Sequence, residues 1–460
     1  MSQASQASQA EPHFATGTNY AFVDKLLEYG ESHEAQVGDR VRDEDEEFEG
    51  VITSKTDDLI VVRADTGETH EISADAYLYI EDSPLIAGIW DAQLRAPDPD
   101  GVAYSDVSVP EPLRLRLNAQ LQRLIDDEPA DFHPGSGDRV RDLVHPSLYP
   151  YVTGTSVSDA VLTVRENPDY DRWGRAFESS IYQWLPTPFQ IANDGSTSIA
   201  GYINNLDQTK YAALYTDLSE LFSCALPLIE GVLGYIQETT FWTEECKEID
   251  HEGELPEVTR NAAPKPGPSP LLMRGRELQV IPKIVEYRID ASSAHEGVWH
   301  VEGMSHEHIV AACIYIVDRD DALFGGELRF KRAYTVEEAG KLFWNVDQCR
   351  PLPIERMVEE GVIPLGSVAT PRGRIIVFPN SHIHKLSALE WQGLTEEGRR
   401  RVIVFWIVDP EVQIPSTREI APQQERFSRD EALAMRLALM EERKRHKQTL
   451  NVRTVSLCEH

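Results

Sequence analysis

The second half of the chain is dominated by short apolar runs that have the length of buried β-strands. Residues 280–285, 309–317, 374–378 and 401–408 are rich in β-branched and other apolar side chains. Runs of this kind are typical of strands that are covered on both faces. Many short strands that close on themselves indicate a double-stranded β-helix, also called a jelly roll. We therefore expect an α+β protein with a jelly-roll core over residues 271–425 and flanking helices.

The rest of the sequence divides into segments of different character. Residues 1–14 begin with a polar triplet repeat, which predicts a disordered tail and lacks the basic and apolar regions of a signal peptide. Residues 37–80 alternate short apolar runs with acidic turns, which predicts a small SH3-like β-module. Residues 85–270 are expected to hold helical and mixed structure. A C-terminal helix is expected over 428–450, where acidic residues come first and basic residues last.

Composition restricts the partners and the compartment of the protein. The 44 Lys and Arg residues against 77 Asp and Glu residues give a net charge of −33, which disfavours nucleic acid and anionic membranes as partners. The five cysteines are scattered without a CxxC pair, as expected for reduced thiols in the cytoplasm. Pro227 and Glu230 interrupt the best apolar stretch. The stretch is therefore not expected to span a membrane. Two helices are expected in this part of the chain, over 209–221 and 225–238.

The strongest chemical signal is the pair His300 and Glu302 in the segment WHVEG. On a β-strand, residues i and i+2 point to the same face, so the imidazole and the carboxylate can converge on one ion. A second histidine from a distant strand would complete a facial triad of two histidines and one carboxylate, as in non-haem Fe(II) oxygenases. His382 and His384 are both candidates, and strand parity does not separate them. An isolated HxE, however, also occurs by chance.

The order of the parts carries more information than any single motif. A strand-borne His-x-acid is followed by Gly-Gly-x-Leu at 325–328, by Gly-Arg and an apolar strand at 373–378, by a histidine, and by an arginine before the last apolar strand. This order resembles the Fe(II)/2-oxoglutarate-dependent dioxygenase superfamily, in its prolyl-hydroxylase-like branch. The chain is also similar to a family of such proteins found in fungi and bacteria, over about 85–425. The segments that carry this resemblance are 142–151, 182–186, 202–206, 223–233, 299–303, 378–386 and 405–423.

The resemblance implies a role for each site residue. His300, Glu302 and His384 would bind Fe(II), with His384 preferred over His382 because it lies two residues before an apolar strand residue. Arg400 lies two residues after a glycine and six before Trp406, and would hold the distal carboxylate of the cosubstrate 2-oxoglutarate with its planar fork of donors. Arg399 and Arg401 would face the opposite side of the strand, where solvated or salt-bridged roles are expected.

Some features depart from the superfamily pattern. Glu302 stands where most members have aspartate. Ile316 stands where many prolyl-hydroxylase-like enzymes place a tyrosine near the cosubstrate, and the neighbouring Tyr315 faces the other way. The second residue that holds 2-oxoglutarate is therefore not identified. Residues 335–360 form an insertion that would serve as a lid or as a packed structural element.

The implied reaction uses Fe(II), 2-oxoglutarate and O2 to hydroxylate a small-molecule or peptide substrate, with release of succinate and CO2. Two alternatives remain open at this point. One is a catalytically silent jelly-roll protein that recruits a protein partner through the 37–80 module. The other is a cupin-like metalloenzyme that does not use 2-oxoglutarate. The module itself would be either that partner site or an inserted structural domain.

Overall fold

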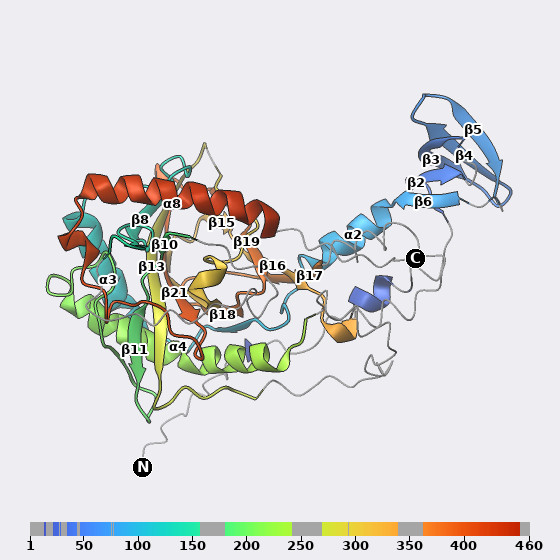
Figure 1. Ribbon diagram of the computed structural model, residues 1–460. Coiled ribbons are helices and arrows are strands. Elements are labelled where there is room, and N and C mark those ends of the chain that lie inside the picture. Colours follow the sequence, from blue (N-terminus) through green and yellow to red (C-terminus); the bar gives the residue numbers. More distant parts are fainter. Residues whose placement is uncertain are drawn as a thin grey trace, which may run out of the picture.

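The main body of the protein is built on one large antiparallel sheet and a smaller sheet that faces it (Figure 1). The computed structural model describes residues 13–14, 22–26, 28, 35–43, 47–74, 76, 78–156, 180–241, 269–292, 294–338 and 362–450, without the side chains of 13–14 and 444–450. All the strand pairs of this described part are antiparallel, so the protein is a mixed α+β chain with antiparallel sheets. Residues 1–12, 242–268 and 339–361 lie outside it. Most of the expected disordered tail and nearly all of the 335–360 insertion therefore lie outside the described residues.

The large sheet has the strand order β1-β7-β18-β14-β21-β13-β11-β12, and β8 also pairs with β13. Its long central strands are the apolar runs seen in the sequence. Their bounds are β13 Glu277–Asp290, β14 Ile309–Arg319, β18 Ile375–Pro379 and β21 Glu397–Val408. The outer strands are β1 His13–Phe14, β7 Ala103–Ser105, β8 Val140–Val144, β11 Thr187–Ile191 and β12 Thr197–Ile199.

The smaller sheet has the order β17-β16-β19. Its strands are β16 Leu328–Ala333, β17 Val362–Val368 and β19 Ile383–Leu386. Two short pairs complete the main body, namely β9 Tyr151–Val152 with β10 Tyr182–Gln183, and β15 Leu323–Gly325 with β20 Leu389–Trp391. Two 3-10 turns, η1 Ser305–Glu307 and η2 Gln423–Glu425, lie in the connecting segments.

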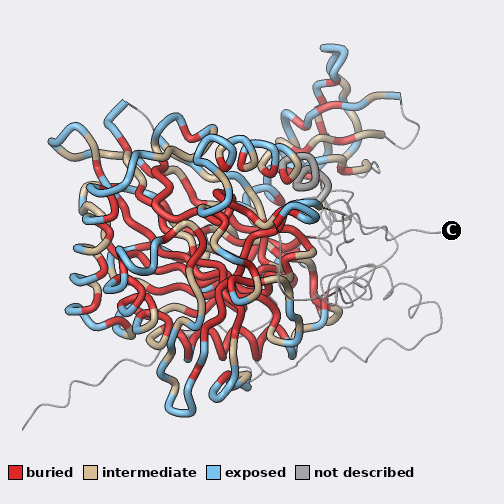
Figure 2. Tube along the Cα trace, turned by 60° about the vertical axis from the view of Figure 1, so that its left-hand side comes forward, coloured by how far each residue is buried: buried red, intermediate tan, exposed pale blue. Residues whose placement is uncertain are grey.

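Side chains alternate between two cores along β21. Phe405 and its alternating neighbours Ile403 and Ile407 pack in the cluster that holds helix α3 (Glu111–Asp127) and helix α4 (Ala212–Glu238). Trp406 belongs to a second cluster, which includes Phe330 of the smaller sheet. One face of the large sheet is therefore covered by helices and the other by the smaller sheet. Figure 2 shows that buried residues fill this region.

Helix α4 corrects the expectation of two helices. It is continuous from Ala212 to Glu238 with Pro227 inside, because its residues pack as one buried element in the helix-covered core. Among the described residues it is the one helix long and apolar enough to cross a membrane, but 72% of its most apolar window is buried within the protein. Burial of this kind is typical of a core helix of a folded domain.

The N-terminal module is a five-stranded antiparallel sheet with the order β5-β4-β3-β2-β6. Its strands are β2 Arg40–Asp43, β3 Glu49–Lys55, β4 Leu59–Ala64, β5 Thr69–Ser73 and β6 Leu78–Asp82. It has its own small core around Val41, Ile52 and Val62. Helix α2 (Pro84–Gln93) leads from it toward the main body (Figure 1). The SH3-like assignment and the predicted domain boundaries remain predictions.

Helix α8 covers Arg429–Leu450, where the charge pattern predicts a helix. Two of its arginines reach into the main body. Arg436 forms a salt bridge with Asp131 at 2.8 Å, and Arg443 pairs with the buried Glu307, which follows the His300 segment. The helix therefore packs on the same region that carries the candidate site.

Candidate metal centre

The structure brings His300, Glu302 and His384 together. One ligand atom from each lies within 4.8 Å of the others. Nε2 of His300 is 3.6 Å from Oε1 of Glu302, and Nε2 of His384 is 3.4 Å from the same oxygen. The side chains of His300, Glu302 and His384 are 29%, 12% and 3% exposed. Access from solvent is therefore on the side of His300.

The local structure around His300 differs from the expected strand. His300 forms only an isolated β-bridge, with His384 of β19. The two backbone hydrogen bonds of that bridge are 3.0 Å and 2.9 Å long. Residues 301 and 302 have no strand structure. The prediction that a regular strand carries His300 and Glu302 is therefore wrong. Their two side chains nevertheless converge, as predicted.

Hydrogen bonds fix both imidazole rings in the same tautomer. Nδ1 of His300 is 2.8 Å from the carbonyl oxygen of Val298, and Nδ1 of His384 is 3.1 Å from the carbonyl oxygen of His382. A carbonyl oxygen can only accept, so each Nδ1 carries the hydrogen and donates it. Each Nε2 then has a lone pair directed toward Glu302, which is the arrangement that metal-ligating histidines usually show.

Asn380 holds the backbone of Glu302 in place. Its side-chain oxygen accepts from the Glu302 N–H at 2.7 Å, and its amide donates to the carbonyl oxygens of Glu302 and Ile309, both at 2.9 Å. Asn380 is fully buried. The sequence analysis assigned no role to Asn380. Its place directly after an apolar strand, in FPN, is the signal that could have identified it.

The carboxylate of Glu302 is held in its charged form. Burial raises the pKa of this group, but hydrogen bonds and charges from His300 and His384, in the form that also carries a proton on Nε2, outweigh burial and hold the pKa well below its usual value. A metal ion would displace those Nε2 protons and meet a lone pair on each ring. An ionised carboxylate between two nitrogen lone pairs is a complete donor set for a divalent transition metal.

His382 does not join the triad. It is fully buried and its Nε2 donates to the carbonyl oxygen of Asp100 at 2.7 Å. Burial lowers the pKa of His382 to about 3, so the ring is neutral. Of the two candidate histidines, His384 is therefore the one that joins His300 and Glu302.

Arg400 is buried on the face of β21 that turns toward the smaller sheet. It is 2% exposed, and its Nε and Nη1 have no hydrogen-bond partner among the described residues. Burial lowers the pKa of Arg400 to about 10, so the guanidinium is still charged at neutral pH. Its Cζ lies 5.3 Å from the ring centre of Tyr287 on the adjacent strand. A buried, unpaired cation of this kind is costly unless an anion binds there.

The neighbouring arginines face the other way, as strand parity predicts. Arg401 pairs with the buried Glu286 at 2.9 Å, on the face covered by α3. Arg399 is half exposed and pairs with Glu397. The same parity separates Ile316, which lies in the core between the sheets, from Tyr315, which packs against the helices.

A second group, His133, Asp142 and His145, also has ligand atoms within 4.8 Å of one another. Its chemistry is different. Asp142 already accepts a hydrogen bond from His133 at 3.0 Å, and Arg436 lies 3.5 Å away. The N–H of Ser147 donates to Nδ1 of His145 at 3.1 Å, so the hydrogen of this neutral ring is on Nε2. Neutral His145 therefore has no free lone pair, and we assign no metal to this group.

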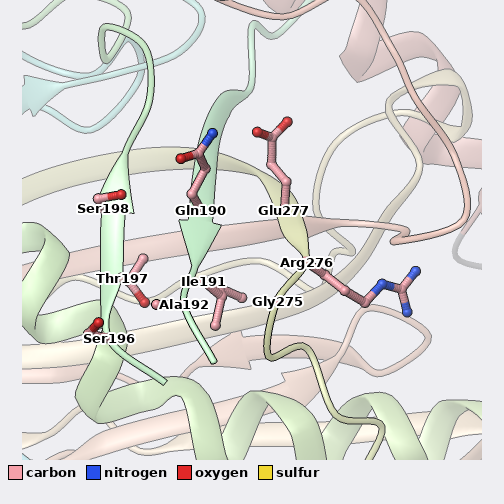
Figure 3. A pocket seen from close by; sticks show the side chains of 9 residues that line it. All are labelled: Gln190, Ile191, Ala192, Ser196, Thr197, Ser198, Gly275, Arg276 and Glu277. Carbon is pink, nitrogen blue, oxygen red and sulfur yellow. The ribbon is translucent and has the colours of Figure 1, made fainter. Parts of the chain in front are cut away.

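A polar pocket of about 370 Å³ lies elsewhere, at the β11–β12 edge of the large sheet (Figure 3). Arg276 lies in its wall and pairs with Glu411 at 2.9 Å. The pocket shares no residue with the triad, and we assign no function to it. Its lining residues are Gln190, Ile191, Ala192, Ser196, Thr197, Ser198, Gly275, Arg276 and Glu277.

Fold and site together define a mixed α+β protein with antiparallel sheets and a His-Glu-His group that could hold a metal ion. The chain belongs to the family described as "Protein of unknown function (DUF4246)", whose model matches residues 86–431. The matched region contains the triad and Arg400, and it begins after the five-stranded module. No curated protein matches the chain.

Several solved structures are similar at low identity. A prolyl hydroxylase from Trichoplax adhaerens, in complex with a hypoxia-inducible-factor peptide, is 9% identical, covers 68% of this chain and 84% of its own, and has a TM-score of 0.27. A 2OG-Fe(II) oxygenase family oxidoreductase from Burkholderia pseudomallei is 13% identical, with coverages of 73% and 93% and a TM-score of 0.28. IDO from Bacillus thuringiensis is 9% identical, with coverages of 67% and 89% and a TM-score of 0.29. At these TM-scores the function has to be argued from the site itself.

Proposed function

We propose that the protein is an Fe(II)/2-oxoglutarate-dependent dioxygenase. The observation that carries the proposal is the triad geometry. Two imidazoles with their Nδ1 atoms committed to carbonyl oxygens direct their Nε2 atoms at one buried carboxylate. Two histidines and one carboxylate, with room for further ligands, are the donor set of non-haem Fe(II) oxygenases. His300, Glu302 and His384 would hold the iron.

Arg400 supports the use of a dicarboxylate cosubstrate. Its guanidinium is buried, its Nε and Nη1 have no hydrogen-bond partner among the described residues, and it lies on the side of β21 that faces the smaller sheet. A carboxylate accepts two parallel hydrogen bonds from such a group. We propose that this carboxylate belongs to 2-oxoglutarate, whose 2-oxo acid end would bind the iron.

The strand arrangement supports a double-stranded β-helix as the scaffold. In this proposal β18, β14, β21 and β13 form one wall. The other wall is β17, β16 and β19 together with residues 295–300, which bridge to β20 through His295↔Leu389 and to β19 through His300↔His384. The triad then lies where the irregular segment 295–300 meets β19 of the second wall.

When bound, iron and 2-oxoglutarate supply the oxidative chemistry, in which O2 is used, succinate and CO2 are released and a C–H bond of the substrate is hydroxylated. The residues of the chain orient these groups and keep water out of the site. The substrate is a small molecule or a peptide, and the cytoplasm is the proposed compartment.

The test is an anaerobic titration of apo-protein with Fe(II) and then 2-oxoglutarate, followed by the visible charge-transfer band of the iron chelate. Wild type is compared with His384→Ala and Arg400→Ala, and with Arg399→Ala as the matched control, because Arg399 is half exposed and lies on the opposite face of β21. We expect a band in wild type and Arg399→Ala, no band in His384→Ala, and a band that needs much more 2-oxoglutarate in Arg400→Ala.

The alternatives give different results. Iron binding without a 2-oxoglutarate band in wild type would favour the cupin-like metalloenzyme. Folded wild type that binds no iron would favour the catalytically silent binding protein. Equal bands in Arg400→Ala and wild type would remove Arg400 from the cosubstrate site while leaving the triad in place.

A further inference from the structure

A buried ionic cluster lies behind the distal histidine. The guanidinium of Arg332 on β16 is fully buried. It donates to both carboxylate oxygens of Glu338 at 2.7 Å and 2.8 Å, and to Asp100 at 2.9 Å. The hydroxyl of Tyr235 on α4 donates to the same oxygen of Asp100 at 2.6 Å. The cluster therefore joins α4, β16, the segment before β7 and Glu338 at the start of the 335–360 insertion.

The packing around this cluster is tight. Gly101 has a φ of +73°, and a Cβ there would lie 2.6 Å from Cε1 of Tyr235. The residue next to Asp100 must therefore be small for the tyrosine to reach the carboxylate. At the other side, Thr335 and Glu338 cap one another, because the Thr335 N–H donates to Glu338 at 2.9 Å and the Glu338 N–H donates to the Thr335 hydroxyl at 3.2 Å.

His382 connects the cluster to the metal centre. Its side chain donates to the backbone carbonyl of Asp100 at 2.7 Å, and its own backbone carbonyl accepts the Nδ1 hydrogen of His384 at 3.1 Å. The orientation of the His384 ring thus depends on the His382 peptide group, and that peptide group is held by a side chain anchored on the cluster. Phe330 packs against both rings, with ring centroids 6.3 Å from His382 and 6.2 Å from His384.

An ionic cluster is an expensive way to fill a protein core. Buried ion pairs can often be replaced by apolar side chains of similar volume without loss of stability. A cluster with Arg332 and Glu338 completely buried is therefore better explained by a requirement for fixed hydrogen-bond geometry than by stability alone. The group whose geometry it fixes is the backbone that holds His384.

We propose that the cluster of Asp100, Arg332, Glu338 and Tyr235 acts through His382 as a positioning device for the distal metal ligand, and so sets the metal affinity without touching the ion. The inference rests on the proposed metal centre and extends it. It also ties the first turn of the insertion to the metal, because Glu338 belongs to both.

The test measures Co(II) affinity and the visible Co(II) ligand-field spectrum of the full chain, neither of which depends on enzyme turnover. His382→Leu removes the donor to Asp100, and His382→Gln keeps a donor at the position of Nε2. Loss of a hydrogen-bond partner of a metal ligand typically costs about 10- to 100-fold in affinity. His382→Leu keeps the backbone carbonyl that accepts from His384 but removes the side-chain anchor of that peptide group, so we expect a weakening of up to that factor and a changed spectrum, with most of both restored in His382→Gln.

Two further variants separate positioning from folding. Tyr235→Phe removes a single hydrogen bond to Asp100 and should weaken Co(II) binding in the same direction by a smaller factor, even if His382→Leu does not fold. Arg401→Met breaks a buried ion pair on the opposite face of β21 and should lower the stability while leaving Co(II) affinity unchanged.

The outcomes distinguish this inference from the proposed function. Wild type that binds no Co(II) would overturn both the metal centre and the positioning device. Wild-type affinity and spectrum in folded His382→Leu and in Tyr235→Phe would overturn the positioning device alone. A loss of affinity in Arg401→Met as large as in His382→Leu would show that general destabilisation is the cause, and would also overturn it.

Discussion

Asn380→Ala should damage both the stability and the metal affinity of the protein. The fully buried Asn380 makes three hydrogen bonds, of 2.7, 2.9 and 2.9 Å, to the N–H and carbonyl of Glu302 and to the carbonyl of Ile309. Each buried bond contributes about 1 kcal/mol net, and somewhat more when its partner is left unsatisfied. We therefore expect a loss of about 3 to 4 kcal/mol in the free energy of unfolding.

The loss should also appear in metal binding, since Asn380 fixes the backbone that carries the Glu302 ligand. Urea unfolding of the apo-protein followed by circular dichroism measures the first effect, and Co(II) titration measures the second, with an expected weakening of about 10- to 100-fold. Asn118→Ala is the matched control. Asn118 bonds to Arg401 at 2.7 Å and to Asp318 at 3.1 Å on the helix-covered face, so its loss should lower stability alone. A stability loss below about 1 kcal/mol in Asn380→Ala, or an unchanged Co(II) affinity, would refute this reasoning.

Three other changes have defined outcomes. Arg401→Met leaves the buried Glu286 carboxylate with Arg288, at 2.8 Å, as its remaining ion-pair partner, so urea unfolding should show a loss smaller than the roughly 3 to 5 kcal/mol expected for an uncompensated buried charge, with an unchanged 2-oxoglutarate band. Burial raises the pKa of Glu286, but hydrogen bonds from Arg288 and Arg401 lower it below the ordinary value of 4.5. Its contribution to stability is therefore complete above pH 4.5 and is lost as the pH falls through the folded pKa. The stability advantage of wild type over Glu286→Gln should shrink on acidification below pH 4.5, and a constant advantage down to pH 3 would contradict this. Arg400→Lys should not restore tight 2-oxoglutarate binding, because an ammonium group lacks the planar fork of the guanidinium; a wild-type titration curve would show that charge alone suffices.

Strand periodicity predicted which side chains share a face, because this property is local. Alternation along one strand places Arg400 toward the smaller sheet and Arg401 toward the helices, and it separates Ile316 from Tyr315 in the same way. These assignments needed only the apolar runs and the period of two. Helix α4 was harder to predict, since Pro227 disfavours a helix locally and only the packing of the whole helix compensates for it.

The residues of the candidate metal centre were proposed from the sequence, but their arrangement was decided by tertiary structure. His300 is held beside His384 by a single β-bridge between segments more than eighty residues apart in the sequence, whereas a regular strand was expected. His382 and His384 have the same parity, and they differ only in their surroundings: one is bonded to Asp100, the other directed at Glu302. Asn380 gains its role only where two chain segments meet. Hydrogen bonds between distant segments have no period in the sequence, so the sequence determined the ligand types and the strand faces, and the fold determined which nitrogen meets which oxygen.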